Sequence, residues 1–408
     1  MNRVLSRPAV RTTALWVVFP LLLSVVLQLA EGLYHRAGSH MLDMEVYRAG
    51  ANAVLDGVSP YSVVSGAEEL LFTYPPFSLF FFLPLGPLSL NLVALLWTAL
   101  SVAALQLAVY LALREVRARR VWTLTVVTTM AALLFNPVDQ TLQWGQVSLV
   151  LLALVLVDLW LPDTARFKGV LTGIAAGIKI FPAAFVVYYA FTDRRRAAST
   201  LVGTAVGSVL LAWLVFPAYS REFWLDDVMN TDRIAPTGWV PNESMRAMLA
   251  RVLHSESAAL LPWLALSAAA VVAAAVATRA AHRIGEDRLG LVAVALAILL
   301  ISPVSWHHYW VWIIPVAIFL GDAARRRSSV FLWLCAVVPV AVIALRVNEW
   351  VIPEPPYDPL LLDPLPLFTT SIVTYTTILL LAAVCAYTLV HRDDRAERTA
   401  EPAVGSAR

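Results

Sequence analysis

The stretch MLDMEVYRAGANAVLDGVSPY, residues 41–61, decides how the rest of this chain is organised. It is the first long polar segment after an apolar N-terminal run, and apolar residues such as Met44 and Tyr47 recur in it at helical spacing. Asp43 stands where an N-cap is expected, and Gly57 ends the pattern. The stretch therefore predicts a short helix on a membrane surface, with Asp43 at the boundary between lipid and water.

The composition identifies the class of protein. The chain has 408 residues, of which 60% are hydrophobic and 14% charged, and its mean hydropathy is +0.73. Soluble domains carry about 25% charged residues, so we expect an all-α polytopic membrane protein. A net charge of +2 gives no reason to expect a nucleic-acid partner. Cys335 and Cys385 lie inside apolar runs and are expected to be small core residues, not a disulfide.

The apolar runs predict about 12 membrane segments within one membrane domain, residues 1–390, followed by a charged tail, residues 391–408. The segment PPFSLFFFLPLGP, residues 75–87, is too short for a bilayer that needs about 20 residues, so we expect a second interfacial or re-entrant piece there. The expected segments are residues 12–30, 91–113, 121–135, 146–161, 169–190 as two short helices, 200–217, 257–279, 289–303, 309–321, 329–345 and 370–390.

Basic residues set the orientation of these segments. Clusters of arginine, including Arg3, Arg7 and Arg11 and the run at 325–327, fall in the short loops on one side. Cytoplasmic loops carry such an excess, which predicts that both termini are cytoplasmic. The longer loops, including residues 136–146, 219–255 and 302–309, then face outward and hold most of the polar side chains.

Lys179 interrupts an apolar run at the sequence KIFP, residues 179–182. A lysine at the centre of a membrane costs roughly 2.5–3.5 kcal/mol on insertion scales. Because a proline follows, we expect two short helices broken at this point, with Lys179 lining a polar cavity where it meets an anionic lipid phosphate. The preceding glycines at 169, 173 and 177 lack the Lys-Ser/Thr of a nucleotide loop and predict close helix packing.

Other polar residues have two interpretations each. Asp43 and Glu45 are either a base and its neighbour, or a helix cap and a solvated face; residues two apart on a helix do not face each other, which weakens a joint metal site. His307 and His308 follow Trp306 at a membrane edge, where tryptophans anchor and a histidine can orient a phosphate or share a proton. A zinc site there lacks a third ligand at sensible spacing. Further on, Arg246 and Arg251 either bind phosphate or solvate a short helix.

Six pieces of the sequence together resemble glycosyltransferase family 87, polytopic mannosyltransferases of the GT-C superfamily. The resemblance covers about residues 43–309. The pieces are DMEVYRAG with DGVSPY, FTYPP, NPVDQTLQWGQVS, GIAAGIKIFP, PNES and SPVSWHH. It implies a GT-C fold with interfacial helices in the first outer loop, and transfer of mannose from a polyprenyl-phosphate-mannose donor to a glycolipid or lipoglycan acceptor, with an α-1,2 linkage.

The resemblance also implies roles for residues within these pieces. Asp43 corresponds to the catalytic base, and Lys179 to the lysine of the broken helix. The family's late motif, S-W-x-H-H, aligns with His308 and Tyr309 and leaves His307 at the variable position, so either histidine is a candidate for catalysis. Contacts to the donor phosphate or substrate are expected from Lys179, Glu45, Tyr47, Tyr74, Gln146, Asn242, Arg246 and Trp306.

The expected reaction is a single inverting displacement at the outer face of the cytoplasmic membrane, with no cofactor and no required metal. The partners are membrane lipids, the lipid-linked donor and the acceptor. Other interpretations stay open from the sequence: a transporter or flippase of lipid-linked sugars, a GT-C transferase of another sugar such as arabinose, a protein O-mannosyltransferase, and a non-catalytic scaffold that keeps the fold. The lone buried lysine and the absence of a repeat in the sequence disfavour the transporter.

Overall fold

The computed structural model describes residues 16, 19–34, 41–66, 69–230, 233–234, 236–352 and 357–391. The predicted cytoplasmic arginines near the N-terminus and nearly all of the charged tail lie outside these residues. The described chain divides into two compact units. Unit 1 takes the chain up to Leu161 with Leu171–Ile180 and Thr204–Ile234, and unit 2 takes Pro162–Val170, Phe181–Gly203 and the chain from Ala235 onward.

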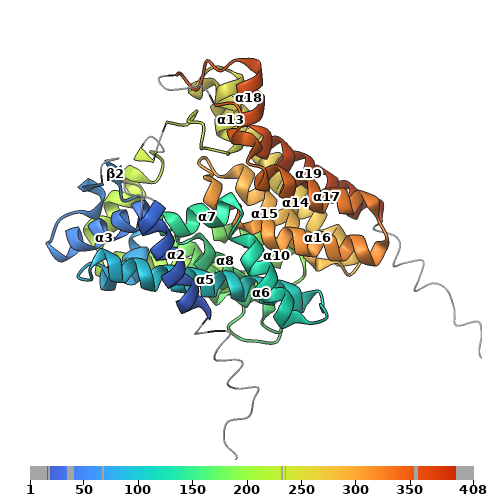
Figure 1. The fold of residues 1–408 in the computed structure, drawn as a ribbon, viewed down its shortest axis with the longest axis horizontal. Coiled ribbons are helices and arrows are strands. Elements are labelled where there is room, and N and C mark those ends of the chain that lie inside the picture. Colours follow the sequence, from blue (N-terminus) through green and yellow to red (C-terminus); the bar gives the residue numbers. More distant parts are fainter. Residues whose placement is uncertain are drawn as a thin grey trace, which may run out of the picture. The chain divides into compact units, whose positions relative to one another are not determined.

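Unit 1 is built from helices and one small hairpin (Figure 1). The long helix α5 packs against α8 and α2. The hairpin pairs β1 and β2 antiparallel, with Val64 opposite Leu71. The elements are α2 (Phe19–Tyr34), α3 (Leu42–Leu55), η2 (Pro60–Ser62), β1 (Val64–Ser65), β2 (Leu70–Leu71), η3 (Pro76–Ser78), α4 (Leu79–Phe82), η4 (Leu83–Leu85), α5 (Leu90–Glu115), α6 (Val121–Ala132), α7 (Asn136–Gln143), α8 (Ser148–Trp160), most of α9 (Val170–Ile178), α12 (Pro217–Arg221) and η6 (Glu222–Asp227).

Unit 2 is a bundle in which α14 packs on α15 and α19, and α16 on α17, as the orange and red helices of Figure 1 show. Its elements are η5 (Phe181–Ala184), α10 (Phe185–Phe191), α13 (Met245–Val252), α14 (Glu256–Arg283), α15 (Asp287–Ile301), η8 (His307–Trp312), α16 (Ile313–Arg327), α17 (Val330–Ala344), η9 (Val347–Glu349), α18 (Pro364–Thr370) and α19 (Ile372–Val390). Helix α11 (Arg195–Val215) contributes residues to both units.

The helices confirm a multi-pass, all-α membrane protein. Within the described residues five helices are long and apolar enough to cross a bilayer: Leu90–Glu115, Arg195–Val215, Glu256–Arg283, Val330–Glu349 and Ile372–Val390. A sixth arises if α6 and α7, which are bent by 77° at their junction, count as one span. Most other predicted segments form shorter helices, such as α8, α15 and α16, so the expected 12 spans stay a prediction. The same holds for the single membrane domain.

Two local predictions are confirmed. The run that contains Lys179 is broken, since α9 ends at Ile178 and η5 begins at Phe181. Glycine also mediates close packing here, because a Cβ on Gly177 would overlap Ser208 of α11 and Phe77. The short apolar piece at residues 75–87 forms only η3, α4 and η4, and its Phe82 stacks on Tyr47 of α3 with 4.2 Å between ring centroids.

Candidate active site

The first turn of α3 is held by the end of α7. The amides of Asp43 and Met44 donate to the carbonyl of Trp144 at 3.0 and 3.2 Å, and the amide of Met41 donates to the carbonyl of Gln143 at 2.8 Å. Free N–H groups at a helix start usually find a side-chain cap. Here the unpaired carbonyls at the end of one helix satisfy the free amides at the start of the next.

This junction corrects the prediction that Asp43 caps the helix. The helix begins at Leu42, its N-cap position is Met41 in a left-handed conformation, and no side chain caps it. Asp43 lies inside the first turn. Because backbone carbonyls have taken over the capping role, the Asp43 carboxylate is left to interact with Gln146.

Gln146 joins Asp43 to two buried tyrosines in unit 1. Its amide group hydrogen-bonds to the Asp43 carboxylate, and its Oε1 accepts from Tyr47 Oη at 3.0 Å and Tyr74 Oη at 3.1 Å. The two phenol oxygens are 2.7 Å apart. Since Gln146 and both rings are buried, this network fixes the direction from which Gln146 meets the carboxylate.

Lys179 completes the network from the other side. Its Nζ donates to Tyr74 Oη at 3.2 Å and lies 5.0 Å from the centroid of the same ring. The lysine occupies the break between α9 and η5, where Pro182 has no N–H to continue the helix. The break brings an ammonium group near a carboxylate that is 136 positions earlier in the chain.

Burial raises the pKa of Asp43 to about 6, against the opposing effects of the Gln146 hydrogen bond and the positive charge of Lys179. Helix α3 is not one of the membrane-length helices. A carboxylate with a pKa near the operating pH can accept a proton and still be ionised beforehand. The arrangement therefore suits a general base beside a cationic group that stabilises an anion.

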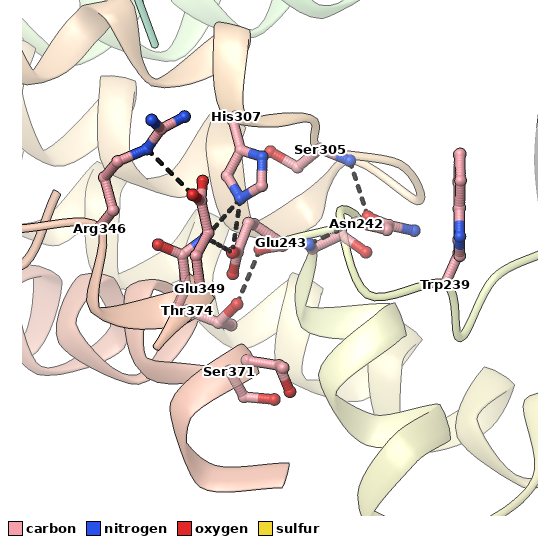
Figure 2. Close-up of polar contacts among 12 residues, drawn as sticks. Trp239, Asn242, Glu243, Ser305, His307, Arg346, Glu349, Ser371 and Thr374 are labelled. Atoms are coloured by element: carbon pink, nitrogen blue, oxygen red, sulfur yellow. Dashed lines mark hydrogen bonds and ion pairs between the residues drawn. The ribbon is translucent and has the colours of Figure 1, made fainter. Parts of the chain in front are cut away.

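Unit 2 holds a second polar cluster, in which hydrogen bonds join the loop around Asn242 to the loop around Ser305 (Figure 2). Asn242 Oδ1 accepts from the amides of Ser244 at 3.1 Å and Ser305 at 3.0 Å, and its Nδ2 donates to the carbonyl of Thr237 at 3.1 Å. The side chain is 1% exposed. Asn242 thus supports the loops in this structure, and its expected contact with substrate stays a prediction.

The two neighbouring histidines have different surroundings. His307 Nε2 lies 3.0 Å from Glu243 Oε1, and its side chain is 12% exposed. His308 is 2% exposed and meets Tyr309 edge to face. Of the two, His307 is the one that a ligand can reach.

The remaining predicted residues lie as follows. Trp306 pairs by backbone bridge with Asn242, and its ring meets Trp239 edge to face. Arg246 lies over the Trp263 ring at 5.5 Å. Glu45 is in unit 1, with its carboxylate beside the turn at Gly66. Arg251 does not lie on a solvent-exposed face of its helix. It is 1% exposed and donates to the carbonyls of Trp239 and Asn242, both at 3.2 Å.

The structure thus brings together five of the predicted side chains in unit 1: Asp43, Tyr47, Tyr74, Gln146 and Lys179. The others, except Glu45, belong to unit 2. Sequence reasoning missed Glu243 and Asn348, which surround His307. Glu243 stood in a quoted piece of sequence, PNES, and a carboxylate two residues before an expected helix could have drawn attention; nothing in the sequence near Asn348 indicated a site.

Comparison with known proteins identifies a matching family and several similar proteins. The sequence model of glycosyltransferase family 87 matches residues 72–303. A polyprenol-phosphate-mannose-dependent α-(1-2)-phosphatidylinositol mannoside mannosyltransferase of Mycolicibacterium smegmatis is 34% identical over 368 residues, covering 82% of this chain and 81% of the relative. One with the same description from Mycobacterium tuberculosis is 28% identical, covering 81% of each.

A third relative, a polyprenol-phosphate-mannose-dependent α-(1-2)-phosphatidylinositol pentamannoside mannosyltransferase of Mycobacterium tuberculosis, is 34% identical over 335 residues, covering 80% of this chain and 76% of the relative. No solved structure matches the chain. The matched residues 72–303 include Tyr74, Gln146, Lys179 and Glu243, while Asp43 and His307 lie beyond either end of the family match.

Proposed function

The chain belongs to glycosyltransferase family 87, and from this membership we propose that it transfers mannose from polyprenyl-phosphate-mannose to a glycolipid. Three relatives at 28–34% identity are described as polyprenol-phosphate-mannose-dependent mannosyltransferases that form α-(1-2) linkages. Their acceptors are phosphatidylinositol mannosides. We propose the same donor and linkage for this chain, with an acceptor of the same lipid class.

The observation that carries the mechanism is the pairing of Asp43 with Lys179 around Tyr74 and Gln146 in unit 1. Asp43 removes the proton from the acceptor hydroxyl while that oxygen attacks the anomeric carbon of the donor. The bond from this carbon to the phosphate oxygen breaks, and its electron pair leaves with the lipid phosphate. One displacement inverts the anomeric configuration.

Positive groups stabilise the departing phosphate, which leaves as an anion and needs no strong general acid. Lys179 is the cation beside Asp43 in unit 1. In unit 2, His307 is the more exposed of the two histidines, and its role in catalysis stays a prediction. The proposal requires no metal, because Lys179 already supplies a positive charge beside Asp43.

We further propose that the site faces the outside of the cytoplasmic membrane, with both termini inside. The arginine-rich ends of α14 and α16, Arg279 with Arg283 and Arg325–Arg327, support this orientation through the positive-inside rule. A lipid-linked donor would then present its sugar at the outer surface, where the sequence predicts the helix that begins near Asp43.

The test is mannose transfer from radiolabelled polyprenyl-phosphate-mannose into phosphatidylinositol mannosides by membranes that carry the full chain. Asp43→Asn keeps the shape of the side chain and an oxygen that Gln146 can bind, but it cannot take up a proton. We expect the rate to fall about 10²–10⁴-fold. Asp56→Asn, an exposed acid at the other end of α3, is the matched control and should keep the wild-type rate.

Equal transfer by wild type and Asp43→Asn would remove Asp43 from the reaction. If the wild type transferred nothing from polyprenyl-phosphate-mannose but did transfer from a polyprenyl-phosphate-arabinose donor, the transferred sugar would be arabinose and not mannose. Movement of labelled lipid across vesicle membranes without any glycosylated product would show that the protein is a flippase and not a transferase.

A further inference from the structure

A cavity of about 820 Å³ lies in unit 2, between the start of α17 and the end of α19. One part of its wall is basic and is formed by Arg326 and Arg327, at the end of α16. Another part is apolar and is formed by Phe331 of α17 with Tyr387 and Val390 of α19. Ligand pockets measure roughly 300–1,000 Å³, so this cavity has room for a ligand that needs both charged and apolar contacts.

Acidic residues hold the basic part of the wall in place. Arg326 donates through Nη2 to Glu286 at 2.7 Å and through Nε to Asp322 at 2.8 Å. Arg327 is held less closely by the same acid, since its Nη2 lies 3.7 Å from Glu286 Oε1, beyond hydrogen-bond distance. A guanidinium carries five N–H donors, so Arg327 can bind a further anion in addition to Glu286.

The residues around this wall carry more positive than negative charge. Two carboxylates, those of Glu286 and Asp322, form ion pairs with four guanidinium groups, which is an excess of two positive charges within the cluster. Arg327 is 21% exposed and Arg326 32% exposed. Charges that are shielded from water attract one another more strongly than charges in open solvent, so the cluster favours an anion in the cavity. The four guanidinium groups belong to Arg288, Arg325, Arg326 and Arg327.

The apolar part of the wall continues into a surface that faces lipid. The rings of Phe331 and Tyr387 stack with 6.5 Å between centroids, and the His391 imidazole stacks on Tyr387 at 4.3 Å. Phe331 is exposed, and so are Leu334 and Val338, which follow it at helical spacing along α17. Both α17 and α19 are long and apolar enough to cross a bilayer. Acyl chains can therefore reach the cavity along these helices.

We propose that this cavity binds one anionic phospholipid, whose phosphate meets Arg327 and whose acyl chains lie along α17 and α19. Basic pockets between membrane helices are typical sites for anionic head groups. A zwitterionic lipid offers the same chains, but its head group also carries a cation that the arginines repel. The proposal uses residues of unit 2 alone and does not depend on mannose transfer.

The competing occupant is the tail of the chain, because the acidic residues Asp393 and Asp394 follow His391 in the sequence. A tail carboxylate could pair with Arg327, but it would leave the apolar part of the cavity without a partner. One lipid molecule would satisfy both parts. The two occupants differ in whether the protein distinguishes one lipid from another.

The experiment measures lipid binding by native mass spectrometry of the purified full chain in a neutral detergent. The probes are phosphatidylglycerol and phosphatidylcholine with the same acyl chains. We expect the first phosphatidylglycerol to bind at least about fivefold more tightly than phosphatidylcholine. Arg327→Gln should remove most of this difference, because one basic residue contributes about fivefold to binding of an anionic lipid.

Arg325→Gln is the matched control for charge. It removes one positive charge from the same cluster, but Arg325 is 67% exposed and does not line the cavity. It should keep the wild-type preference for phosphatidylglycerol. An equal loss in Arg325→Gln and Arg327→Gln would show that the overall charge of this end attracts the lipid, and it would overturn the proposed site.

A second pair of variants tests the cavity without a change of charge. Ala386 is exposed on α19 and lines the cavity, whereas Ala382 is exposed one turn earlier and does not line it. Ala386→Trp should fill the cavity and abolish the preference for phosphatidylglycerol, and Ala382→Trp should keep it. Retention of the preference in Ala386→Trp would place the lipid elsewhere.

Two further outcomes would overturn the proposal. If glycerol phosphate in excess displaced the bound lipid as effectively as phosphatidylglycerol does, the site would recognise the phosphate alone. If the wild type bound both lipids equally, and a preference for phosphatidylglycerol emerged only when Asp393 and Asp394 were both changed to asparagine, the tail would be the occupant. Neither outcome bears on mannose transfer, so the proposed function is tested separately.

Discussion

At the scale of single residues, Asp43 and Glu45 show how two carboxylates on one helix turn acquire different properties. Asp43 is bound by Gln146 and lies near Lys179, whereas Glu45 lies beside the turn at Gly66. Residues two apart on a helix point in different directions. Of the two, Asp43 is therefore the one placed beside a cation, and burial raises its pKa.

The raised pKa predicts the pH dependence of transfer. Asp43 must be ionised to act as a base, and burial raises its pKa to about 6. As pH falls below 6 the carboxyl becomes protonated, so kcat/KM should fall about tenfold per pH unit. The measurement is a pH–rate profile of mannose transfer.

Gln146→Met provides the comparison for this profile. The Gln146 hydrogen bond lowers the pKa of Asp43, so its loss should move the acid limb to higher pH. An acid limb near pH 4 in the wild type, or one that Gln146→Met leaves in place, would show that another group controls the rate.

Metal removal should leave the reaction intact. The positive charge near Asp43 comes from Lys179, so we expect that EDTA treatment followed by transfer into metal-free buffer changes the initial rate less than twofold. Loss of activity that Mg²⁺ or Mn²⁺ restores would contradict this mechanism and would require a divalent ion at the donor phosphate.

At the scale of elements, the junction of α7 with α3 positions the base. Gly145 has a φ of +70°, and a Cβ there would come within 2.8 Å of Met41 Sδ and Met44 Cβ. Glycine is therefore required twice, for the backbone conformation and for the close approach of α3. The turn between α7 and α8 therefore fixes the position of the first turn of α3.

Gly145→Ala should displace the start of α3 and with it Asp43. Because a shift of 1 Å can cost about 10²-fold in rate, we expect a comparable loss of mannose transfer. Gly57→Ala is the matched control: its φ is +75°, yet nothing lies within 4 Å of the added Cβ. Both variants carry backbone strain of about 1–2 kcal/mol, so equal rates at equal abundance would rule out the positioning role of the junction.

At the scale of the whole molecule, the distribution of arginine predicts a topology that labelling can check. In a chain whose Cys335 and Cys385 are replaced by alanine, Ser62→Cys should react with a membrane-impermeant maleimide in intact cells. Thr164→Cys, in an arginine- and lysine-rich loop, should react only after permeabilisation. The reverse pattern would place the site in the cytoplasm.

The sequence by itself determined the class of protein and the positions of most elements. Apolar runs must be helical in lipid, because every backbone group there needs an internal partner. The helix near residue 43, the break at Lys179 and the packing role of Gly177 were predictable for the same reason: each depends on residues close together in the chain. The family resemblance, carried by short motifs, is confirmed by the comparisons.

Only the tertiary structure decided which side chains meet. Asp43 was expected to cap its helix, but the carbonyls at the end of α7 occupy that role. The meeting of Asp43 with Gln146 and Lys179, and of His307 with Glu243, joins segments that lie 64 to 136 positions apart. Local patterns constrain neighbours along the chain, whereas hydrogen bonds between distant segments exist only once the helices are packed.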